Sequence, residues 1–395
     1  MKIGIVVQRY GKDILGGAEN IARGLSEHLL KYYDIEVLTT CAKDYSTWKN
    51  IYKEGIEIID GVKVRRFKNL SIRGLMFKLL DYYIFKYKNI RDVSFNKQFK
   101  YIEAQGPYSP ELIKYVKDHK DEYNVFLFFT YLYYPTIFGV ITVPEKSIII
   151  PTAHNEAPIY LGIFKILFRI PKGIIYLSED EKEFVEKTFK NSYIENEVIG
   201  SGVDTIDSDP ETFRKKHNIK SRFILYSGRI DKGKGSHILI DYFLKYKQKQ
   251  KNDIKLVLIG KKYIDIPVSD DIIYLGYIPP NSKDIFDANK SAYVTVHPSS
   301  TESLCLSLLE SLSQGTPVLV NGNCTVLKSH CLRSKSGYFY LDYNQFEEKL
   351  NLLLENENLR NEMGKNGKEY INNNYSWDKI EKRYVNFIDR IAMKI

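Results

Sequence analysis

The sequence is poor in cysteine and has no long apolar run. Its 395 residues include four cysteines, and no two of them have the Cys-x-x-Cys spacing. This argues against a disulfide scaffold or a structural zinc site and favours reduced thiols in a cytoplasmic protein. No uncharged apolar run approaches the ~20 residues that a membrane-spanning helix needs. The apolar start of the chain is interrupted at Gln8, too early for a secretory signal, and it predicts a buried first strand.

The composition is that of folded globular domains. Hydrophobic residues make up 44% of the chain and charged residues 27%, which excludes a disordered or fibrous protein. Short apolar strands alternate with helical stretches, a pattern typical of parallel sheets covered on both faces. We therefore expect an α/β fold with two doubly wound, Rossmann-like domains that face a cleft, and ligands at the carboxyl ends of the strands.

The expected domains divide near Gly200. The first covers residues 1–199 together with a C-terminal helix at 376–395, and the second covers residues 200–375. The expected strands are 3–7, 36–39, 62–67, 125–129, 147–150 and 173–177 in the first domain, and 223–226, 255–259, 272–275, 292–296 and 317–320 in the second.

Positive charge is concentrated in one segment. Residues 61–100 hold eleven basic and two acidic residues, and so account for the whole net charge of +9. Such a patch predicts an anionic partner, which could be nucleic acid, anionic lipid or an acidic substrate. The basic residues are Lys63, Arg65, Arg66, Lys68, Arg73, Lys78, Lys86, Lys88, Arg91, Lys97 and Lys100.

Apolar residues in this basic segment recur with helical spacing from Ile72 to Tyr87. Phe77, Tyr82 and Phe85 fall on the other side, among lysines, as in helices at a membrane interface. The alternative is a core-packed helix with a solvated basic face, and the pattern alone does not choose between the two. No nucleic-acid-binding motif accompanies the charge, so nucleic acid is not expected as a partner.

Two adjacent glycines follow the first predicted strand. In Gly16-Gly17-Ala18-Glu19 they open a helix, where the backbone can approach a ligand closely and negative charge is favoured. A tight turn without a ligand is the alternative. The segment lacks the G-x-G-x-x-G dinucleotide fingerprint, which disfavours a hydride-transfer enzyme.

A second glycine-rich loop, residues 228–236, follows the strand at 223–226. It reads almost as a P-loop, but Gly235 stands where a P-loop carries the Ser or Thr that holds magnesium. Arg229 and Lys234 can instead flank a diphosphate without a metal. A basic surface turn is the alternative, and the position of Arg229 directly after a strand favours the diphosphate.

Two glutamates belong to the unit that follows the strand at 292–296. We expect a helix that begins after Glu302 and ends at Gly315, with Pro317 just beyond it. Glu302 and Glu310 would then lie roughly 12 Å apart along the helix axis, about the reach of a nucleotide-sugar from hexose to ribose. Backbone amides at the helix start would face the diphosphate between them. Two unrelated solvent-exposed glutamates are the alternative.

Together, these motifs resemble those of retaining GT-B glycosyltransferases of glycosyltransferase family 4 (glycosyl transferases group 1). The resemblance covers nearly the whole chain and includes Gly16-Gly17-Ala18-Glu19, the Gly228-Arg229…Lys234-Gly235 loop, and Glu302…Glu310 before Gly315-Thr316-Pro317-Val318. The helix that begins near Trp377 resembles the family's C-terminal helix, which crosses back to the first domain.

The resemblance implies roles for particular residues. Arg229 and Lys234 would bind the donor diphosphate, Glu310 the ribose, and Glu302 the transferred sugar. Ser303, Leu304, Cys305 and Leu306 would offer their backbone amides, although the family often has glycines after the first glutamate. Gly16 and Gly17 would approach the diphosphate from the first domain. His154, in Pro151-Thr152-Ala153-His154-Asn155-Glu156, would be the catalytic-site residue of that domain, with a structural histidine at a strand end as the alternative.

The expected reaction is transfer of a hexose from a UDP- or GDP-sugar to a lipid-linked or cell-surface glycan, with no metal and no cofactor. The leaving diphosphate would take the acceptor proton in a front-face attack, and the protein would supply positioning and electrostatic stabilisation. The basic segment 61–100 would dock the enzyme on the inner face of the cytoplasmic membrane. A P-loop NTPase and a non-catalytic nucleotide-sugar binder are the alternatives.

Overall fold

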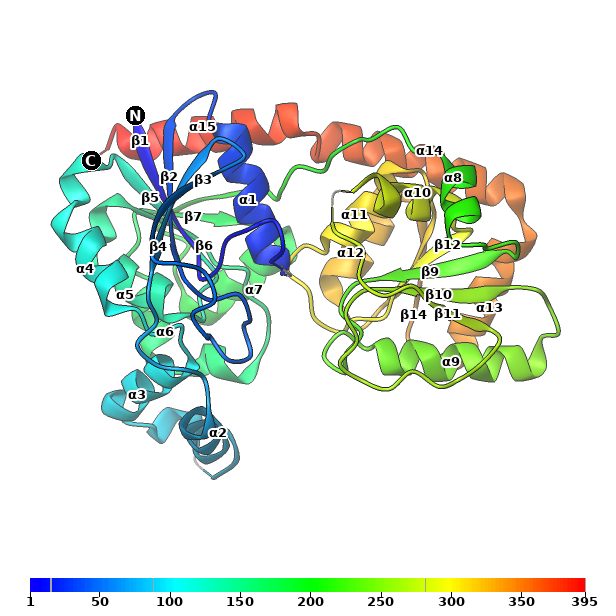
Figure 1. The fold of residues 1–395 in the computed structure, drawn as a ribbon, viewed down its shortest axis with the longest axis horizontal. Coiled ribbons are helices and arrows are strands. Elements are labelled where there is room, and N and C mark those ends of the chain that lie inside the picture. Colours follow the sequence, from blue (N-terminus) through cyan, green and yellow to red (C-terminus); the bar gives the residue numbers. More distant parts are fainter. Residues whose placement is uncertain (15, 88, 281, 395) are drawn as a thin grey trace. The chain divides into compact units, whose positions relative to one another are not determined.

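The computed structural model describes residues 1–394 except 15, 88 and 281 (Figure 1). The chain forms two compact units, one of residues 1–202 with 380–395 and the other of residues 203–379. The sequence predicts the two corresponding boundaries slightly earlier, at 199/200 and 375/376. Among the predicted basic residues, Lys88 lies outside the described residues, as does the side chain of Arg91.

The first unit is built on a sheet of eight strands within the described residues, in the order β3-β4-β2-β1-β5-β6-β7-β8. All neighbours are parallel except β3 and β4. The parallel strands β1, β2 and β4 run outward in one direction and β5 to β8 in the other, so the topological switch lies between β1 and β5. The strands are β1 (Lys2–Val6), β2 (Asp34–Thr40), β3 (Gly55–Ile59), β4 (Val62–Phe67), β5 (Val125–Phe129), β6 (Ser147–Ile150), β7 (Gly173–Tyr176) and β8 (Glu195–Val198).

Helices cover the sheet because its central strands are apolar on both faces. All five residues of β5 are buried, as expected for a parallel strand between two helix layers. The C-terminal helix joins this unit, where Tyr384 donates a hydrogen bond to the Gly200 carbonyl (3.0 Å). The helices are α1 (Gly17–Leu29), α2 (Leu75–Tyr82), α3 (Phe95–Gln105), α4 (Pro110–Asp118), α5 (Tyr134–Thr142), α6 (Gly162–Leu167), α7 (Glu179–Phe189) and α15 (Trp377–Ala392).

The second unit has a parallel sheet in the order β11-β10-β9-β12-β13-β14. Its switch lies between β9 and β12. The strands are β9 (Phe223–Ser227), β10 (Lys255–Ile259), β11 (Ile272–Tyr274), β12 (Val294–His297), β13 (Val318–Asn321) and β14 (Gly337–Tyr340). The helices are α8 (Pro210–Lys216), α9 (Ser236–Lys249), α10 (Lys283–Ser291), α11 (Leu306–Ser313), α12 (Thr325–Ser334), α13 (Tyr343–Glu355) and α14 (Glu357–Asn374).

The strands that the sequence does not predict are β3, β8 and β14, and each is the edge of a sheet. Edge strands are partly solvated and lack the continuous apolar run of a buried strand. In β3 the side chains of Ile56 and Ile58 are exposed, and β8 has the half-buried sequence Glu-Asn-Glu-Val.

The basic segment 61–100 is neither a single helix nor a single patch. Its first cations lie on β4, where Lys63 and Arg65 pair with the buried Glu36 at 3.3 and 2.9 Å. Arg66 is buried and pairs with Glu57. The helical periodicity predicts one helix to Tyr87, but α2 ends at Tyr82 and is followed by a short π-helix, Tyr83–Tyr87.

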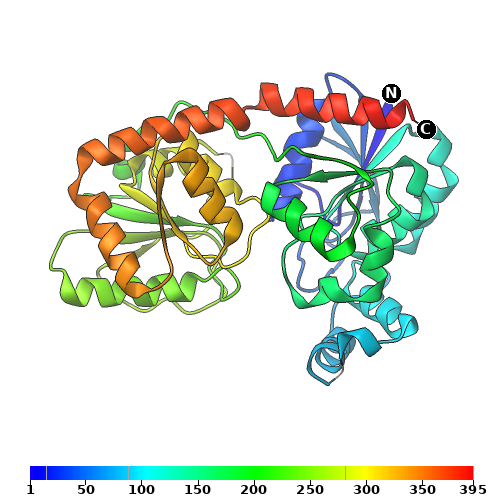
Figure 2. The ribbon, with the colours of Figure 1, turned by 180° about the vertical axis from the view of Figure 1, so that it is seen from behind.

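Helix α2 lies at the end of the first unit, beside α3, and extends away from the sheet (Figures 1 and 2). It has no buried residue, and Leu75, Met76 and Leu79 are each more than half exposed. Among the described helices, none has the length and hydropathy that crossing a membrane requires.

Candidate functional site

Predicted site residues of the second unit lie on loops at the switch point of its sheet. Strands β9 and β12 are parallel neighbours, with Thr295 opposite Leu225. Their carboxyl ends therefore meet at the same edge, and the loops that leave them, residues 228–235 and 298–305, lie next to each other. Open α/β sheets bind ligands at this position.

The loop after β9 is locked in place by backbone contacts. Gly235 has a φ of +70°, and a Cβ there would lie 2.5 Å from the Pro298 carbonyl oxygen, so that only glycine fits. The Asp231 carboxylate accepts a hydrogen bond from the Lys234 amide at 2.7 Å. A P-loop needs a hydroxyl side chain at position 235, where this structure has no room for one. The geometry therefore disfavours the P-loop alternative.

Each of the two cations of this loop lies close to an acidic side chain, one in the neighbouring loop and one in the same loop. The Lys234 ammonium is 2.7 Å from the Glu302 carboxylate, and Arg229 Nε is 3.5 Å from Asp231. Burial lowers the pKa of Lys234, but the Glu302 carboxylate outweighs it and raises the pKa above the ordinary value, while the neighbouring Arg229 charge opposes this rise. Lys234 is therefore a firmly charged side chain with a second cation nearby.

The position of Glu302 differs from the sequence prediction. Helix α11 begins at Leu306, so Glu302 lies in the preceding loop and not at the helix start. The helix cannot extend back because Cys305 has a left-handed conformation, with φ +70°. The axial spacing of roughly 12 Å between Glu302 and Glu310 was based on one continuous helix and is wrong for this loop.

The same loop leaves a row of backbone amides without partners. Within the described part of the chain, the amides of residues 303–307 donate no hydrogen bond, and the first amides of α11 that do so belong to Leu308 and Leu309. Unpaired amides at a helix N-terminus carry partial positive charge and bind anions. Ser303, Leu304, Cys305 and Leu306 are the residues that the sequence assigns to this role, and Ser307 adds one more.

Glu310 is buried inside the unit, with its side chain on α11. Burial, and then the charge of Asp204, raises the pKa of its carboxyl to about 7. Among the residues that the structure describes, none hydrogen-bonds this carboxylate. A buried acid without partners is costly unless a ligand supplies donors.

His297 and Asp231 support the site but are not among the predicted residues. His297 ends β12, is 5% exposed, and lies with its Nδ1 3.8 Å from Cys305 Sγ. Burial lowers the pKa of His297 to about 4, although Glu302 acts in the opposite direction, so the ring is neutral and packs against the loop. The spacing of Asp231 three residues before Lys234 is a turn signal that could have identified it.

In the first unit, the two glycines of the β1–α1 loop differ in what surrounds them. A Cβ on Gly16 would lie 2.0 Å from a Glu19 carboxylate oxygen, and Glu19 is held by Arg9 in a buried ion pair (Nε to Oε1 2.8 Å). A Cβ on Gly17 would have none of the described residues beyond its chain neighbours within 4 Å. Packing therefore explains glycine at 16, whereas the space at 17 is open to a ligand.

His154 lies in the loop after β6, at the same edge of the sheet as the glycines. Its side chain is one third exposed, with Nε2 3.6 Å from the Glu156 carboxylate. Glu156 also accepts a hydrogen bond from Tyr131 (2.7 Å). The loop is anchored by the buried Glu181, which accepts hydrogen bonds from the amides of Ala153 and Leu177. Glu156 belongs to the same motif as His154, whereas Glu181 carries no sequence signal of its own because only the fold brings it here.

Residues 209–370 match the family model described as glycosyl transferases group 1. A curated relative with a similar sequence is the putative glycosyltransferase YtcC of Bacillus subtilis, 26% identical over 279 residues, which are 61% of this chain and 66% of the relative. The chain spans between 60% and 66% of the length of this relative and two archaeal relatives described as uncharacterized glycosyltransferases.

Solved structures resemble the chain over its whole length. Sucrose-phosphate synthase from Thermosynechococcus elongatus has a TM-score of 0.73 at 15% identity, with 100% of both chains covered. Anabaena HepE in complex with UDP-glucose has a TM-score of 0.71 at 14% identity, covering 99% of this chain and 100% of that one. At these identities the likeness establishes the fold. The comparisons together show a GT-B fold over the whole chain and, within the second unit, a region that matches the glycosyl transferases group 1 model.

Proposed function

We propose that this chain is a retaining, metal-independent glycosyltransferase of family 4 that moves a hexose from a nucleoside-diphosphate sugar to a lipid-linked or cell-surface glycan. The observation that carries the proposal is the arrangement at the switch point of the second unit. There, Lys234 and the unpaired amides of residues 303–307 lie on adjoining loops, with Arg229 beside Lys234. Two cations and a helix N-terminus suit a diphosphate.

The acidic side chains suit the two ends of such a donor. Glu302 accepts a hydrogen bond from Lys234 in the free protein. When the diphosphate takes over Lys234, an oxygen of Glu302 becomes available to hydroxyls of the transferred sugar. Glu310 is buried, and its carboxylate has no hydrogen-bond partner among the described residues, so it is suited to the two ribose hydroxyls. The solved complex of HepE with UDP-glucose supports a sugar nucleotide as the donor class.

In the proposed reaction, the bond between the sugar C1 and the diphosphate oxygen breaks, and a bond forms between C1 and an acceptor oxygen on the same face. The acceptor proton goes to the departing diphosphate, whose added charge Arg229, Lys234 and the loop amides stabilise. Retention can be checked by proton NMR of the first product formed, because the anomeric coupling constant reports the configuration. An inverted product would exclude the front-face mechanism but would not contradict the proposed donor site.

A soluble sugar phosphate is the second candidate acceptor, since the sucrose-phosphate synthase structure covers the whole chain. The exposed apolar residues of α2 favour the lipid-linked acceptor instead, because an exposed apolar patch is suited to contact with lipid and is not needed to bind a soluble sugar phosphate. Parallel assays with glycolipid acceptors and with hexose phosphates, using the same donor, separate the two.

A thermal-shift screen with UDP, GDP, ADP and their sugars tests the proposal, because a ligand that binds the folded state raises the melting temperature. We expect one base to stabilise the protein, equally in EDTA and in magnesium. Stabilisation only with magnesium would reject metal independence. Magnesium-dependent NTP hydrolysis without a sugar donor would favour the P-loop alternative, and donor binding without turnover on any acceptor would favour a non-catalytic binder.

Replacing Gly17 by alanine should separate activity from stability. The added Cβ collides with none of the described residues, and alanine favours a helix more than glycine does, so the melting temperature should stay at or above that of the wild type. If the donor passes close to this backbone, kcat/KM should fall at least about tenfold. Gly16→Ala is the matched control and should lower the melting temperature, because its Cβ collides with Glu19. Full activity of Gly17→Ala would remove the glycine from the site.

His154→Ala is expected to lower kcat about a hundredfold with little change in donor KM, because a polar group near the reacting sugar acts mainly in the transition state. His119→Ala provides the control, since that histidine stacks on Tyr115 in the same unit. An equal loss in both variants, or a change confined to donor KM, would contradict the assignment of His154.

A further inference from the structure

Helix α2 and the residues before it present an apolar surface that the rest of the first unit leaves uncovered. We name this surface the α2 face. Its side chains are between 56% and 73% exposed, although the ordinary surface of a soluble protein has only scattered apolar residues. The α2 face consists of Leu70, Ile72, Leu75, Met76, Leu79 and Tyr82.

Contacts on the opposite side of α2 hold the helix against the rest of the first unit. Phe77 packs against Tyr101 of α3, with ring centroids 5.8 Å apart, and Arg73 lies 4.0 Å above the Phe77 ring. An eight-residue helix is unstable alone in water, so these contacts fix α2 while its other side stays open. The exposed leucines are therefore not required for packing against the unit.

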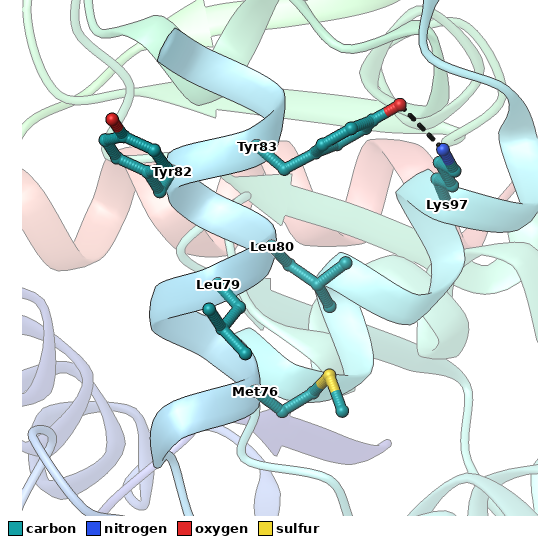
Figure 3. A pocket seen from close by; sticks show the side chains of 6 residues that line it. All are labelled: Met76, Leu79, Leu80, Tyr82, Tyr83 and Lys97. Carbon is teal, nitrogen blue, oxygen red and sulfur yellow. Dashed lines mark hydrogen bonds between the residues drawn. The ribbon is translucent and has the colours of Figure 1, made fainter. Parts of the chain in front are cut away.

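A shallow groove of about 540 Å³ runs between α2 and α3. In Figure 3, the side chains of Met76, Leu80 and Tyr83 extend toward α3, and Tyr82 extends the other way. The polar member of the lining is Lys97, whose ammonium donates a hydrogen bond to the Tyr83 hydroxyl at 2.8 Å. An apolar groove with a cation at its border is suited to a hydrocarbon chain that ends in an anionic group.

Exposed lysines lie on α2, on the π-helix that follows it and on α3. Lys78, Lys86 and Lys100 are exposed and form no ion pair with any residue that the structure describes. By contrast, Lys63, Arg65 and Arg66 on β4 are matched by Glu36 and Glu57. The unmatched charge of the segment therefore lies beside the exposed apolar residues and not on the sheet.

We propose that the α2 face inserts into the headgroup region of an anionic lipid bilayer, with Lys78, Lys86, Lys97 and Lys100 facing the lipid phosphates. Exposed apolar side chains and a tyrosine on α2, with lysines on α2, on the π-helix that follows it and on the neighbouring α3, are the combination that such surfaces bind. A second copy of the chain fits poorly, because a two-fold contact through this face would bring the same lysines opposite one another. The docking depends on this surface alone, and it would bring a lipid-linked acceptor within reach only if the proposed function holds.

Vesicle flotation tests the docking. Wild-type protein should float with phosphatidylcholine vesicles that contain phosphatidylglycerol, at low salt, and remain unbound with phosphatidylcholine alone. The double variant Leu75→Glu/Leu79→Glu should reduce the bound fraction at least about tenfold. Val268→Glu, at a fully exposed position of the second unit, should bind as the wild type does. Lys78→Gln/Lys86→Gln should weaken binding more than Lys220→Gln/Lys251→Gln.

Three results would overturn the proposal. They are failure of the wild type to bind anionic vesicles, equal binding to neutral vesicles, and unchanged binding by Leu75→Glu/Leu79→Glu. Sedimentation without lipid provides a further check, since self-association that this variant abolishes would assign the α2 face to a second copy. The nucleotide-induced melting shift should be the same in all variants, which keeps a docking failure distinct from a failure of the donor site.

Discussion

Replacement of Lys234 by alanine is expected to lower kcat/KM by about a thousandfold, which corresponds to a loss of about 4 kcal/mol of transition-state stabilisation. Two effects add. The departing diphosphate loses a fixed cation, and Glu302, whose side chain is 13% exposed, loses the ammonium that it contacts. The uncompensated carboxylate would then repel the phosphate that Lys234 attracts.

Lys232→Ala is the matched control for this substitution. Lys232 belongs to the same loop and carries the same charge, but its side chain is exposed to solvent. We expect less than about a twofold change in that variant, because an exposed charge is screened. A similar loss in both variants would mean that the loop acts only through its overall charge. Nearly full activity of Lys234→Ala, with an unchanged melting temperature, would remove Lys234 from the site.

The affinity for a sugar nucleotide is expected to fall as the pH decreases through about 7, because burial raises the pKa of Glu310 to that value. The ionised carboxylate can accept two hydroxyl hydrogen bonds, and the protonated acid accepts them less well. Glu310→Gln should weaken binding at pH 8 by roughly ten- to a hundredfold and remove the pH dependence. A sugar nucleotide is the suitable ligand, since its diphosphate does not titrate in this range.

The same substitution should have the opposite effect on the free protein. Because the folded state raises the pKa of Glu310, its contribution to stability is present below the ordinary carboxyl pKa and is lost as the pH rises through about 7. At pH 8, Glu310→Gln should therefore raise the melting temperature without ligand while reducing the ligand-induced shift. The exposed Glu362→Gln of α14 should change neither. Pure destabilisation at pH 8 would indicate a structural role for Glu310.

The fold could be predicted where burial imposes a continuous apolar run, as in β5 or β10, and not where a strand lies at an edge. The late start of α11 could not be predicted, because the left-handed conformation of Cys305 has no residue-type signal. A glycine there would have suggested it. The sequence consequently assigns the right helix to Glu310 but puts Glu302 at the entrance of that helix, although it lies in the preceding loop.

The candidate site, like the fold, could be predicted from the sequence only in part. Arg229 could be predicted as a site residue because it directly follows a strand. The contact between Lys234 and Glu302 could not be predicted, because it joins residues 68 positions apart and depends on β9 lying beside β12. The sequence also could not distinguish Gly16 from Gly17, because the two glycines are adjacent and chemically identical. The structure distinguishes them, since packing against Glu19 explains glycine only at position 16.

Calorimetric titration can establish whether Arg229 and Lys234 hold a diphosphate. The nucleoside, its monophosphate and its diphosphate, for the base that the thermal-shift screen selects, are titrated into the wild type and into Arg229→Ala/Lys234→Ala. The wild type should prefer the diphosphate over the nucleoside by at least about a hundredfold, and the variant by less than about tenfold, with nucleoside affinity unchanged. A variant that keeps the full preference for the diphosphate would contradict the proposed donor site.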